Sequence, residues 1–411
     1  MLAAGSAAEA GADVLLLEKG PALARKLRIS GKGRGNITNT ADMQRFVDAF
    51  GPNGKFLYGA FSRFFRDDLL ALLDRFGVAT KVERGGRVFP ASDRAGDVAD
   101  ALGTWLNELG VNARLNTRTL GLRVEDGRAA GVEVFGGSMP AAAVVIATGG
   151  ASYPKTGSTG DGYAMAASIG HTVAKPEPAL SPMVIREDWV RDLQGLSLRN
   201  VEAALLVRET EGSGWRKVDS EFGEMLFTHF GVSGPIVLTL SRVARRYLGL
   251  AEVAISVDLK PALTAEQLHS RLVRDFARPR RFGAYARSLL PGLMARLFVL
   301  LSGVEAEKTL NKITSAERSR VVELLKNLRM TVESLRPLEE AIVTAGGVAI
   351  AEIDSRTMMS TIVPGVFFAG EVIDIDAKTG GFNLQAAFST GHVAGRGAAD
   401  FVTSQTKEAE R

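Results

Sequence analysis

A short apolar run that ends in two glycines constrains the fold of this chain most strongly. Residues 143–147 read Ala-Val-Val-Ile-Ala, and Thr148, Gly149 and Gly150 follow directly. Continuous apolar runs of this length are typical of strands buried on both faces of a parallel sheet. Paired glycines allow a sharp turn and a close approach of the backbone to a ligand. Because open α/β sheets bind ligands at the carboxyl ends of their strands, the run predicts an α/β fold with a ligand-binding turn here.

A second apolar run, Val14 to Leu17, ends in the carboxylate of Glu18. In dinucleotide-binding βαβ units, an acid that closes the second strand hydrogen-bonds the adenosine ribose, and a strand with a G-x-G-x-x-G loop precedes it. Residues 1–11 are instead Ala-rich and helix-prone, so the chain begins inside the helix of that unit. We therefore expect either a true start upstream of Met1, which makes this chain N-terminally truncated, or a protein without its phosphate loop.

Two glycine-rich loops are open to more than one interpretation. The segment from Arg25 to Asn39 combines cations, glycines and small polar residues without an apolar face. Such a loop can surround a pyrophosphate with backbone N–H groups and cations, but a plain surface loop has the same composition. The loop at 156–162 either closes over a ligand or caps the next helix through Thr159 or Asp161.

The C-terminal part returns to the pattern of the first strands. Residues 365–371 read Gly-Val-Phe-Phe-Ala-Gly-Glu, and a helix with a narrow face of small residues follows Gly381. We expect that face to lie against a sheet. Glycines at a helix start expose unpaired N–H groups, and the helix dipole there favours negative charge. A reduced flavin carries such a charge at its N1/C2 carbonyl end, so this helix start suits a flavin.

The middle of the chain has a different character. Prolines at 176, 178 and 182 mark a domain boundary. Strands are predicted at 193–198, 201–208 and 253–258, and residues 264–329 are helical and basic-amphipathic. Earlier in the chain, Asp93 is expected to cap a helix that runs to Gly110. The expected organisation is a first cofactor-domain part at 1–180, a β-rich insert at 181–262, its helical part at 263–335, and a second cofactor-domain part at 336–411.

Composition excludes several kinds of chemistry. The chain has no cysteine, which excludes a dithiol pair, an iron–sulfur cluster and a Cys nucleophile. Its four histidines, His171, His229, His269 and His392, have no helical metal spacing, so we predict no metal site.

The charge and hydropathy of the chain indicate which kinds of binding partner to expect. Lys and Arg number 50 against 46 Asp and Glu, and the clusters at 242–246 and 278–281 are interpreted as solvated faces. We therefore predict no nucleic-acid partner and keep binding by the basic helical part as an alternative. No apolar run of membrane-spanning length and no signal peptide is visible, so we predict no membrane partner and a cytoplasmic protein.

Taken together, these segments resemble the HI0933-like family of bacterial FAD-dependent oxidoreductases, which includes aminoacetone oxidases and bile-acid-pathway reductases. The resemblance covers nearly the whole chain in the family's order. The matching segments are Leu17–Lys19, Arg25–Lys26, Ser30–Arg34, Asn36–Asn39, Ala147–Gly150, Leu226–Pro235, Thr344–Val348, Gly370–Asp374 and Gly380–Gln385. The resemblance implies a Rossmann-like FAD-binding α/β domain, discontinuous in sequence, that holds an inserted β-barrel-like domain and a helical portion.

The resemblance also assigns roles to residues. Glu18 would take the adenosine ribose, and the segments 148–150 and 370–374 would approach the pyrophosphate and ribityl chain. The segment 381–385 would face the isoalloxazine. The implied FAD-binding residues are Glu18, Lys19, Lys26, Ser30, Gly31, Lys32, Gly33, Arg34, Asn36, Thr38, Thr148, Gly149, Gly150, Gly370, Glu371, Asp374, Gly380, Gly381, Phe382, Asn383, Leu384 and Gln385.

Two departures from the family pattern matter. The glycine fingerprint of the first βα turn is absent, so we expect the chain that starts at Met1 to hold FAD weakly and a version extended upstream to hold it tightly. Gly35 stands where the family commonly has Cys, but hydride chemistry at the flavin N5 does not require that thiol.

The function expected from these features is an FAD-dependent oxidoreductase that moves a hydride between the flavin and a small organic substrate. No second dinucleotide-binding unit is visible, so NAD(P)H would visit the flavin transiently, and oxygen is the other possible partner. His229 is the one histidine considered for catalysis, against a structural role in a turn. The alternatives are a non-catalytic flavin-binding protein and a degenerate paralogue that has lost FAD.

Overall fold

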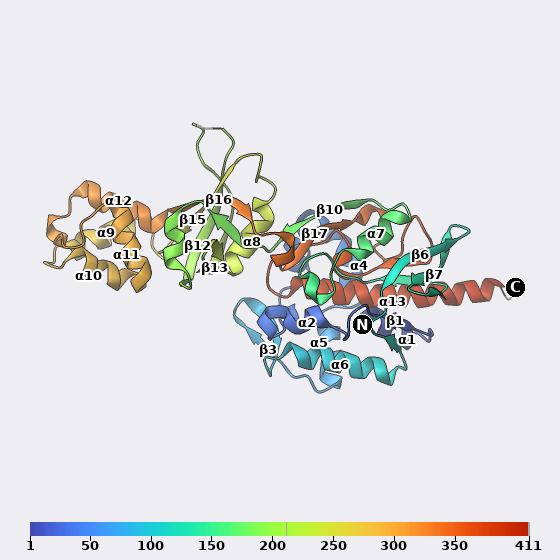
Figure 1. The fold of residues 1–411 in the computed structure, drawn as a ribbon. Coiled ribbons are helices and arrows are strands. Elements are labelled where there is room, and N and C mark those ends of the chain that lie inside the picture. The colour runs from blue at the N-terminus through green and yellow to red at the C-terminus, as the bar shows by residue number, and fades with distance from the viewer. Residues whose placement is uncertain (211, 410–411) are drawn as a thin grey trace. The chain divides into compact units, whose positions relative to one another are not determined.

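The computed structural model describes residues 1–210 and 212–409, which divide into two compact units (Figure 1). The split unit comprises Met1–Pro178 and Leu338–Arg411, and the inserted unit comprises Ala179–Pro337. The inserted unit therefore interrupts the split unit in sequence. Each unit has its own hydrophobic core.

Parallel strand pairs of the split unit confirm the apolar runs as strands. Strand β1 (Leu15–Leu17) pairs with β5 (Asn112–Arg114), and β9 (Val144–Ile146) pairs with β18 (Val366–Phe368). The expected burial on both faces was wrong for β1 and β9, which are only partly buried, whereas β18 is fully buried. Within the described part of the chain, β1 and β9 each pair with one strand, so no strand pairs with the other edge of either.

Three smaller sheets and a set of helices complete the split unit. The sheets are β2 (Thr38–Asn39), β4 (Arg87–Pro90) and β3 (Thr80–Glu83); β6 (Thr119–Glu125), β7 (Arg128–Val134) and β8 (Gly137–Pro140); and β10 (Val173–Ala179) with β17 (Val343–Val348). The helices are α1 (Leu2–Glu9), α2 (Arg25–Ile29), α3 (Met43–Ala49), α4 (Tyr58–Phe61), α5 (Arg66–Arg75), α6 (Ala95–Glu108), α7 (Asp161–Ser168) and α13 (Phe382–Ala409).

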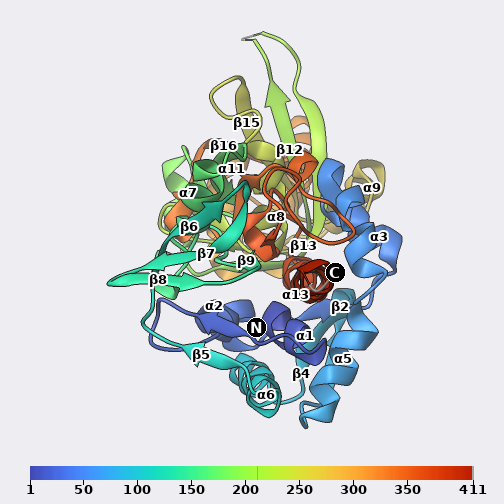
Figure 2. The same cartoon turned by 90° about the vertical axis from the view of Figure 1, so that its right-hand side faces the viewer.

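The small residues of α13 serve a helix contact as well as a strand contact. Figures 1 and 2 show α1 directly beside α13. A Cβ on Gly395 would lie 2.1 Å from the Ala3 carbonyl oxygen, and one on Gly391 would lie 3.2 Å from the Leu2 Cβ. The expectation of a small-residue face against a sheet was therefore wrong at these positions, because α1 covers them. Glycine is needed where two helix backbones approach this closely.

The inserted unit contains a closed six-stranded barrel, as the β-rich insert predicted. Its strands are, in spatial order, β11 (Met183–Ile185), β14 (Gly231–Ser233), β13 (Arg216–Phe227), β12 (Ser197–Arg208), β15 (Glu252–Asp258) and β16 (Leu328–Leu335). Alternate residues of β12, such as Leu205, which faces Ile255 of β15, are buried inside. The separate strand predicted at 193–198 was wrong, because β12 begins at Ser197 and continues through a register shift to Arg208.

Helices fill the remainder of the inserted unit. Thr264 and Thr314 form capping boxes with the side chains three residues later, as N-caps of this type do. The predicted helical stretch is confirmed up to Lys326, and Leu328 already belongs to β16. The helices are α8 (Pro235–Ala244), α9 (Ala265–Phe276), α10 (Phe282–Leu289), α11 (Gly292–Ser302) and α12 (Ser315–Lys326).

Candidate cofactor site

A pocket of about 210 Å³ lies where β1 ends and α2 begins. Glu18, Lys19, Lys26 and Thr148 line it, so four of the predicted residues come together there. The Glu18 carboxylate accepts a hydrogen bond from the Gly20 N–H at 2.6 Å through one oxygen. An acid at this point of a nucleotide-binding unit is suited to accept ribose hydroxyls.

The loop at 156–162 lies over this pocket. Thr156, Gly157 and Ser158 line the pocket. Helix α7 has Gly160 as its N-cap without a side-chain bond, so capping through Thr159 or Asp161 was wrong.

Asp161 holds that loop in place through cations. It accepts bonds from Lys19 at 3.0 Å and from Arg118 at 3.0 and 3.1 Å. Burial raises the pKa of Asp161, but the bonds from Arg118, Lys19 and Thr159 outweigh burial and lower it below its ordinary value. The carboxylate is therefore charged at neutral pH and closes one wall of the pocket.

A second cluster ties α2 to the turns after β9 and β18. Lys26 Nζ donates to Glu371 at 2.7 Å and to Ser152 Oγ at 2.8 Å. Glu371 also accepts from the Thr344 backbone N–H at 2.7 Å. A Cβ on Gly150 would lie 2.4 Å from Thr344 Oγ1 and 2.8 Å from Glu371 Oε1, so this turn admits only glycine. Sequence reasoning assigned no site role to Ser152 or Thr344, although Thr344 begins a Thr-Ala-Gly-Gly segment similar to Thr148–Gly150.

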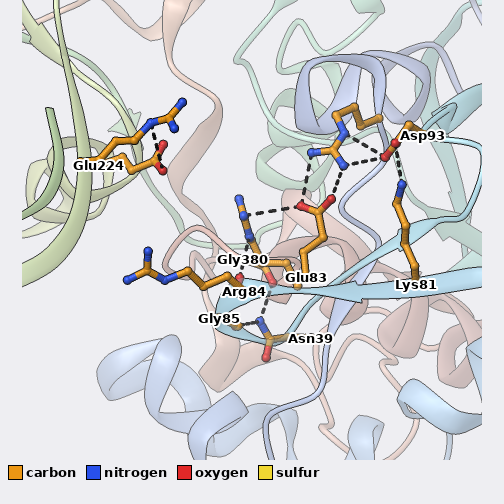
Figure 3. Close-up of polar contacts among 11 residues, drawn as sticks. Asn39, Lys81, Glu83, Arg84, Gly85, Asp93, Glu224 and Gly380 are labelled. Atoms are coloured by element: carbon orange, nitrogen blue, oxygen red, sulfur yellow. Dashed lines mark hydrogen bonds and ion pairs between the residues drawn. The ribbon is translucent and has the colours of Figure 1, made fainter. Parts of the chain in front are cut away.

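The glycine loop at 30–35 is fixed by an ion network, which Figure 3 shows. Arg34 donates to Glu83 of β3 and to Asp93, at 2.9 Å from Nε, and Lys81 donates to Asp93 at 2.6 Å. The bond from Arg34 holds the pKa of Glu83 below its usual range, and the bonds from Lys81 and Arg34 do the same for Asp93. The Arg34 guanidinium group is thus paired with two carboxylates, and these ion pairs hold the loop against the β3–β4 hairpin.

This network also explains why Asp93 does not cap a helix. Asp93 was expected to cap the helix that runs to Gly110, but α6 begins at Ala95 with Arg94 as its N-cap. Asp93 has a φ of 57° and directs its carboxylate to Arg34 and Lys81 instead.

The loop brings Asn36, Thr38 and Asn39 against the start of α13. Asn39 Nδ2 donates to the carbonyl oxygens of Gly85 and Gly380, both at 3.0 Å (Figure 3). The Asn36 amide, in the orientation that satisfies both groups, accepts from the Gly381 N–H at 3.1 Å. Gly381 has a φ of 97°, and a Cβ there would lie 2.3 Å from the Thr38 carbonyl oxygen. Segments more than 340 residues apart therefore meet.

Several predicted residues are engaged by the protein itself. The Phe382 ring packs edge-on against Phe46, with ring centroids 4.7 Å apart. Asn383 donates to the Ala377 carbonyl at 3.1 Å and accepts from its N–H at 2.8 Å. Asp374 accepts from the Asn53 amide at 2.7 Å through its backbone carbonyl.

The remaining predicted positions are described by their backbone and exposure. Lys32 is exposed, and Leu384 is half-buried against the core around Trp105. The others have positive φ, as turns that favour glycine do: Gly31, Gly33, Gly149, Gly370 and Gly380.

Unsatisfied buried oxygens test whether these residues fit a bound group. Ser30 Oγ, Thr38 Oγ1 and Gln385 Oε1 are buried and have no hydrogen-bond partner, and Thr38 and Gln385 are completely buried. Only two further side-chain atoms of the described residues share this state, and both lie in the inserted unit. Buried polar groups without partners are costly and uncommon. Three such oxygens in segments that the family resemblance assigns to FAD, two of them hydroxyls that both donate and accept hydrogen bonds, therefore fit a bound polar group.

Other chemistries are poorly supported. His171, Glu352 and Ser360 form a chain with distances of 3.1 and 2.7 Å that resembles a nucleophile triad. Ser360 is buried, and its Oγ already accepts from the N–H groups of Ile362 and Val363, so this chain is structural.

His229 lies exposed in the turn between β13 and β14, with its ring edge-on to Phe230, and its part in catalysis stays a prediction. Among residues 1–210 and 212–409, no group of three or more His, Asp or Glu side chains could hold a metal ion. No helix in these ranges is long and apolar enough to cross a membrane.

Two bacterial proteins are similar to this chain over nearly its whole length. A 3-dehydro-bile acid delta(4,6)-reductase of Clostridium scindens is 29% identical over 408 residues, which cover 97% of this chain and 95% of that protein. A ribosomal RNA dihydrouridine synthase of Escherichia coli is 29% identical over 393 residues, which cover 95% and 93%.

A solved structure and a family model also match this chain. The structure of Mycobacterium smegmatis Sdh1 in complex with UQ1 has a TM-score of 0.50 and 19% identity, and the match covers all of this chain and 70% of that one. This likeness concerns the fold alone. The family model of the HI0933-like protein Rossmann domain matches residues 1–397. The chain therefore belongs to the HI0933-like family.

Proposed function

We propose that this protein is an FAD-dependent oxidoreductase that reduces a carbon–carbon double bond conjugated to a carbonyl group. The three unpaired buried oxygens of Ser30, Thr38 and Gln385 support the cofactor part of the proposal, because they belong to segments that the family resemblance assigns to FAD binding. Bound FAD would supply hydride transfer at its N5. The side chains and backbone of this chain would bind and orient the FAD.

Each end of the site has a distinct task. Glu18 would accept the ribose hydroxyls, and the pocket beside it would hold the adenosine part. The turn at Gly149 and Gly150 would bring backbone N–H groups to the pyrophosphate. Lys26, held by Glu371 and Ser152, would contribute positive charge near that group without free rotation.

The start of α13 would stabilise the reduced ring. Unpaired N–H groups and the helix dipole favour negative charge at this point. The contacts of Asn36 and Asn39 with Gly381 and Gly380 hold that first turn in a fixed position. Electrostatic stabilisation of this kind is effective because the donors are oriented before the reaction begins.

The names of two relatives support the proposed reaction class. A delta(4,6)-reductase and a dihydrouridine synthase both add hydrogen across a double bond that is conjugated to a carbonyl. In such a reduction the electron-poor β carbon accepts a hydride, the conjugated carbonyl takes up the resulting negative charge, and a proton from solvent then adds to the α carbon to give the saturated product. Both relatives match this chain over at least 93% of their own length, so a shared reaction type is the simplest reading of the two names.

The proposal is tested by anaerobic stopped-flow spectroscopy of the FAD-loaded protein. NADPH or NADH should bleach the flavin absorbance, since NAD(P)H is the proposed visiting donor. A 4-en-3-one steroid or a uridine-containing RNA should then restore it, whereas the corresponding saturated compounds should not. A flavin that binds but that no donor reduces would support the non-catalytic alternative, and reoxidation by the saturated controls would contradict the reaction class.

A further inference from the structure

A buried threonine from another sheet holds the turn that follows β9. Thr344 belongs to β17, which lies in a different sheet from β9 and β18, and its side chain is completely buried. Its Oγ1 accepts hydrogen bonds from the backbone N–H groups of Ala151 at 2.9 Å and Ser152 at 3.1 Å. A hydroxyl oxygen has two acceptor positions, so this one side chain satisfies two consecutive N–H groups of the turn.

The two N–H groups just before these have no such partner. Among residues 1–210 and 212–409, no oxygen accepts a hydrogen bond from the N–H of Gly149 or of Gly150, although Gly150 is buried. Buried backbone N–H groups without a partner are rare in folded proteins. Successive N–H groups in a turn can bind an anion. Thr344 therefore takes the later pair of donors in this turn, and the earlier pair is available to a ligand.

Thr344 is itself fixed by the carboxylate of Glu371. The Thr344 N–H donates to Glu371 Oε1 at 2.7 Å, and Ser152 Oγ donates to the same oxygen at 3.2 Å. Lys26 Nζ donates to Glu371 Oε2 at 2.7 Å and to Ser152 Oγ at 2.8 Å. Each of these four residues thus contacts at least two of the others or the turn, and such networks hold their members in one arrangement.

The turn also packs directly against the Thr344 side chain. A Cβ on Gly150 would lie 2.4 Å from Thr344 Oγ1 and 2.8 Å from Thr344 Cβ. The position of Thr344 therefore limits where the backbone of the turn can lie. Valine has nearly the same shape as threonine, so Thr344→Val removes the two hydrogen bonds and keeps this contact.

We propose that Thr344 is a positioning residue for the cofactor: it holds the turn after β9 so that the N–H groups of Gly149 and Gly150 donate to the pyrophosphate of bound FAD. The inference rests on the proposed function, because it takes FAD as the ligand. Donors that are already oriented bind an anion more tightly, since the ligand does not have to order them.

The first test is titration of FAD fluorescence with the full chain and three variants. Thr344→Val should raise the Kd for FAD roughly 10-fold, the order expected when two hydrogen bonds that orient the site are lost. Thr344→Ser keeps the accepting oxygen and should bind FAD within about 2-fold of the wild type.

Ser360→Ala is the matched control. Ser360 is buried in the split unit, and its Oγ also accepts from two consecutive N–H groups, those of Ile362 at 3.0 Å and Val363 at 2.8 Å. Thr344→Val and Ser360→Ala should both lower the urea denaturation midpoint of the cofactor-free protein, because each leaves two N–H groups without their acceptor. Only Thr344→Val should weaken FAD binding.

The second test needs no variant. Amide hydrogen exchange of the wild-type protein should show Ala151 and Ser152 protected both without and with FAD. Gly149 and Gly150 should exchange quickly without FAD and become protected when FAD is added. This measurement decides the proposal even if Thr344→Val does not fold.

Three results would overturn the proposal: equal FAD affinities for Thr344→Val and Ser360→Ala, FAD binding by Thr344→Ser as weak as by Thr344→Val, or exchange at Gly149 and Gly150 that FAD does not change. If the wild type binds FAD and any of these results is found, the cofactor assignment stands and only the role of Thr344 fails. If the predicted affinities and protection are found but no donor reduces the flavin, the role of Thr344 stands and the proposed reaction fails. A wild type that binds no FAD would overturn both.

Discussion

Replacing Thr38 by Val should make the cofactor-free protein more stable and its FAD complex weaker. Thr38 is completely buried in β2, and its Oγ1 has no partner, so the wild type carries the desolvation cost of an unsatisfied hydroxyl. That cost is about 1 to 3 kcal/mol. Valine has nearly the same shape and suits a strand, so the variant should gain free energy of unfolding up to that amount.

The FAD complex should respond in the opposite direction. If FAD donates a hydrogen bond to Thr38 Oγ1, its loss should weaken binding by about 0.5 to 1.5 kcal/mol, or roughly 2- to 10-fold in Kd. Urea denaturation of the cofactor-free protein gives the first quantity, and titration of FAD fluorescence gives the second.

Thr390→Val is the matched control for this experiment. Thr390 is equally buried, but its Oγ1 accepts from the Gly370 N–H at 3.0 Å and donates to the Ala386 carbonyl at 2.6 Å. The same substitution there should destabilise the protein by about 1 to 3 kcal/mol, because it leaves the Gly370 N–H without a partner. The reasoning is refuted if Thr38→Val destabilises the cofactor-free protein as much as Thr390→Val does.

Three further predictions concern stability and charge. Burial lowers the pKa of His171, so the unfolded chain takes up a proton at a higher pH than the folded chain does. The free energy of unfolding should therefore fall as the pH drops below about 6.5. Urea denaturation midpoints measured at successive pH values should show a smaller fall for His171→Asn than for the wild type. Gly395→Ala should lower the free energy of unfolding through overpacking by about 1 to 3 kcal/mol and so lower the Tm, whereas Gly103→Ala, which has open space in α6, should raise the Tm slightly. Lys26→Gln should weaken FAD binding more than Lys32→Gln, since only Lys26 is held in place by Glu371, and equal effects in FAD titrations would remove Lys26 from the site.

The sequence predicted the positions of turns and strands better than it predicted which strands are neighbours. Glycines mark the turns because close approaches and positive φ angles select them, as at Gly150 and Gly381. The apolar runs identified β1, β9 and β18, but the partial burial of β1 and β9 depends on which neighbours each strand has, and composition does not contain that information.

The ion-pair partners of charged side chains were not predicted from the sequence. Arg34 follows a glycine loop and reads as a phosphate ligand, yet Glu83 and Asp93, which are 49 and 59 residues away, take its guanidinium group. The same long-range contact removed Asp93 from its expected capping role. Asp161 was considered as a cap, but Lys19 and Arg118 make it a wall of the pocket. Such contacts are set by the tertiary fold and leave no local pattern in the sequence.

Charge shows the same limit on a larger scale. The net charge of +4 for the whole chain combines +6 on α9 to α12 with a slightly acidic remainder. The inner stripe of α9 separates its arginines from the core, and this separation becomes visible only when the helix and its buried face are known.

The most direct test of the account is the visible absorption spectrum of the purified protein before and after saturation with FAD, followed by release and identification of the chromophore. We expect a saturable two-banded spectrum that differs from that of free FAD, with FAD as the released compound, and a weaker response in Thr38→Val. A spectrum identical to that of free FAD at every concentration would contradict the assignment of the site.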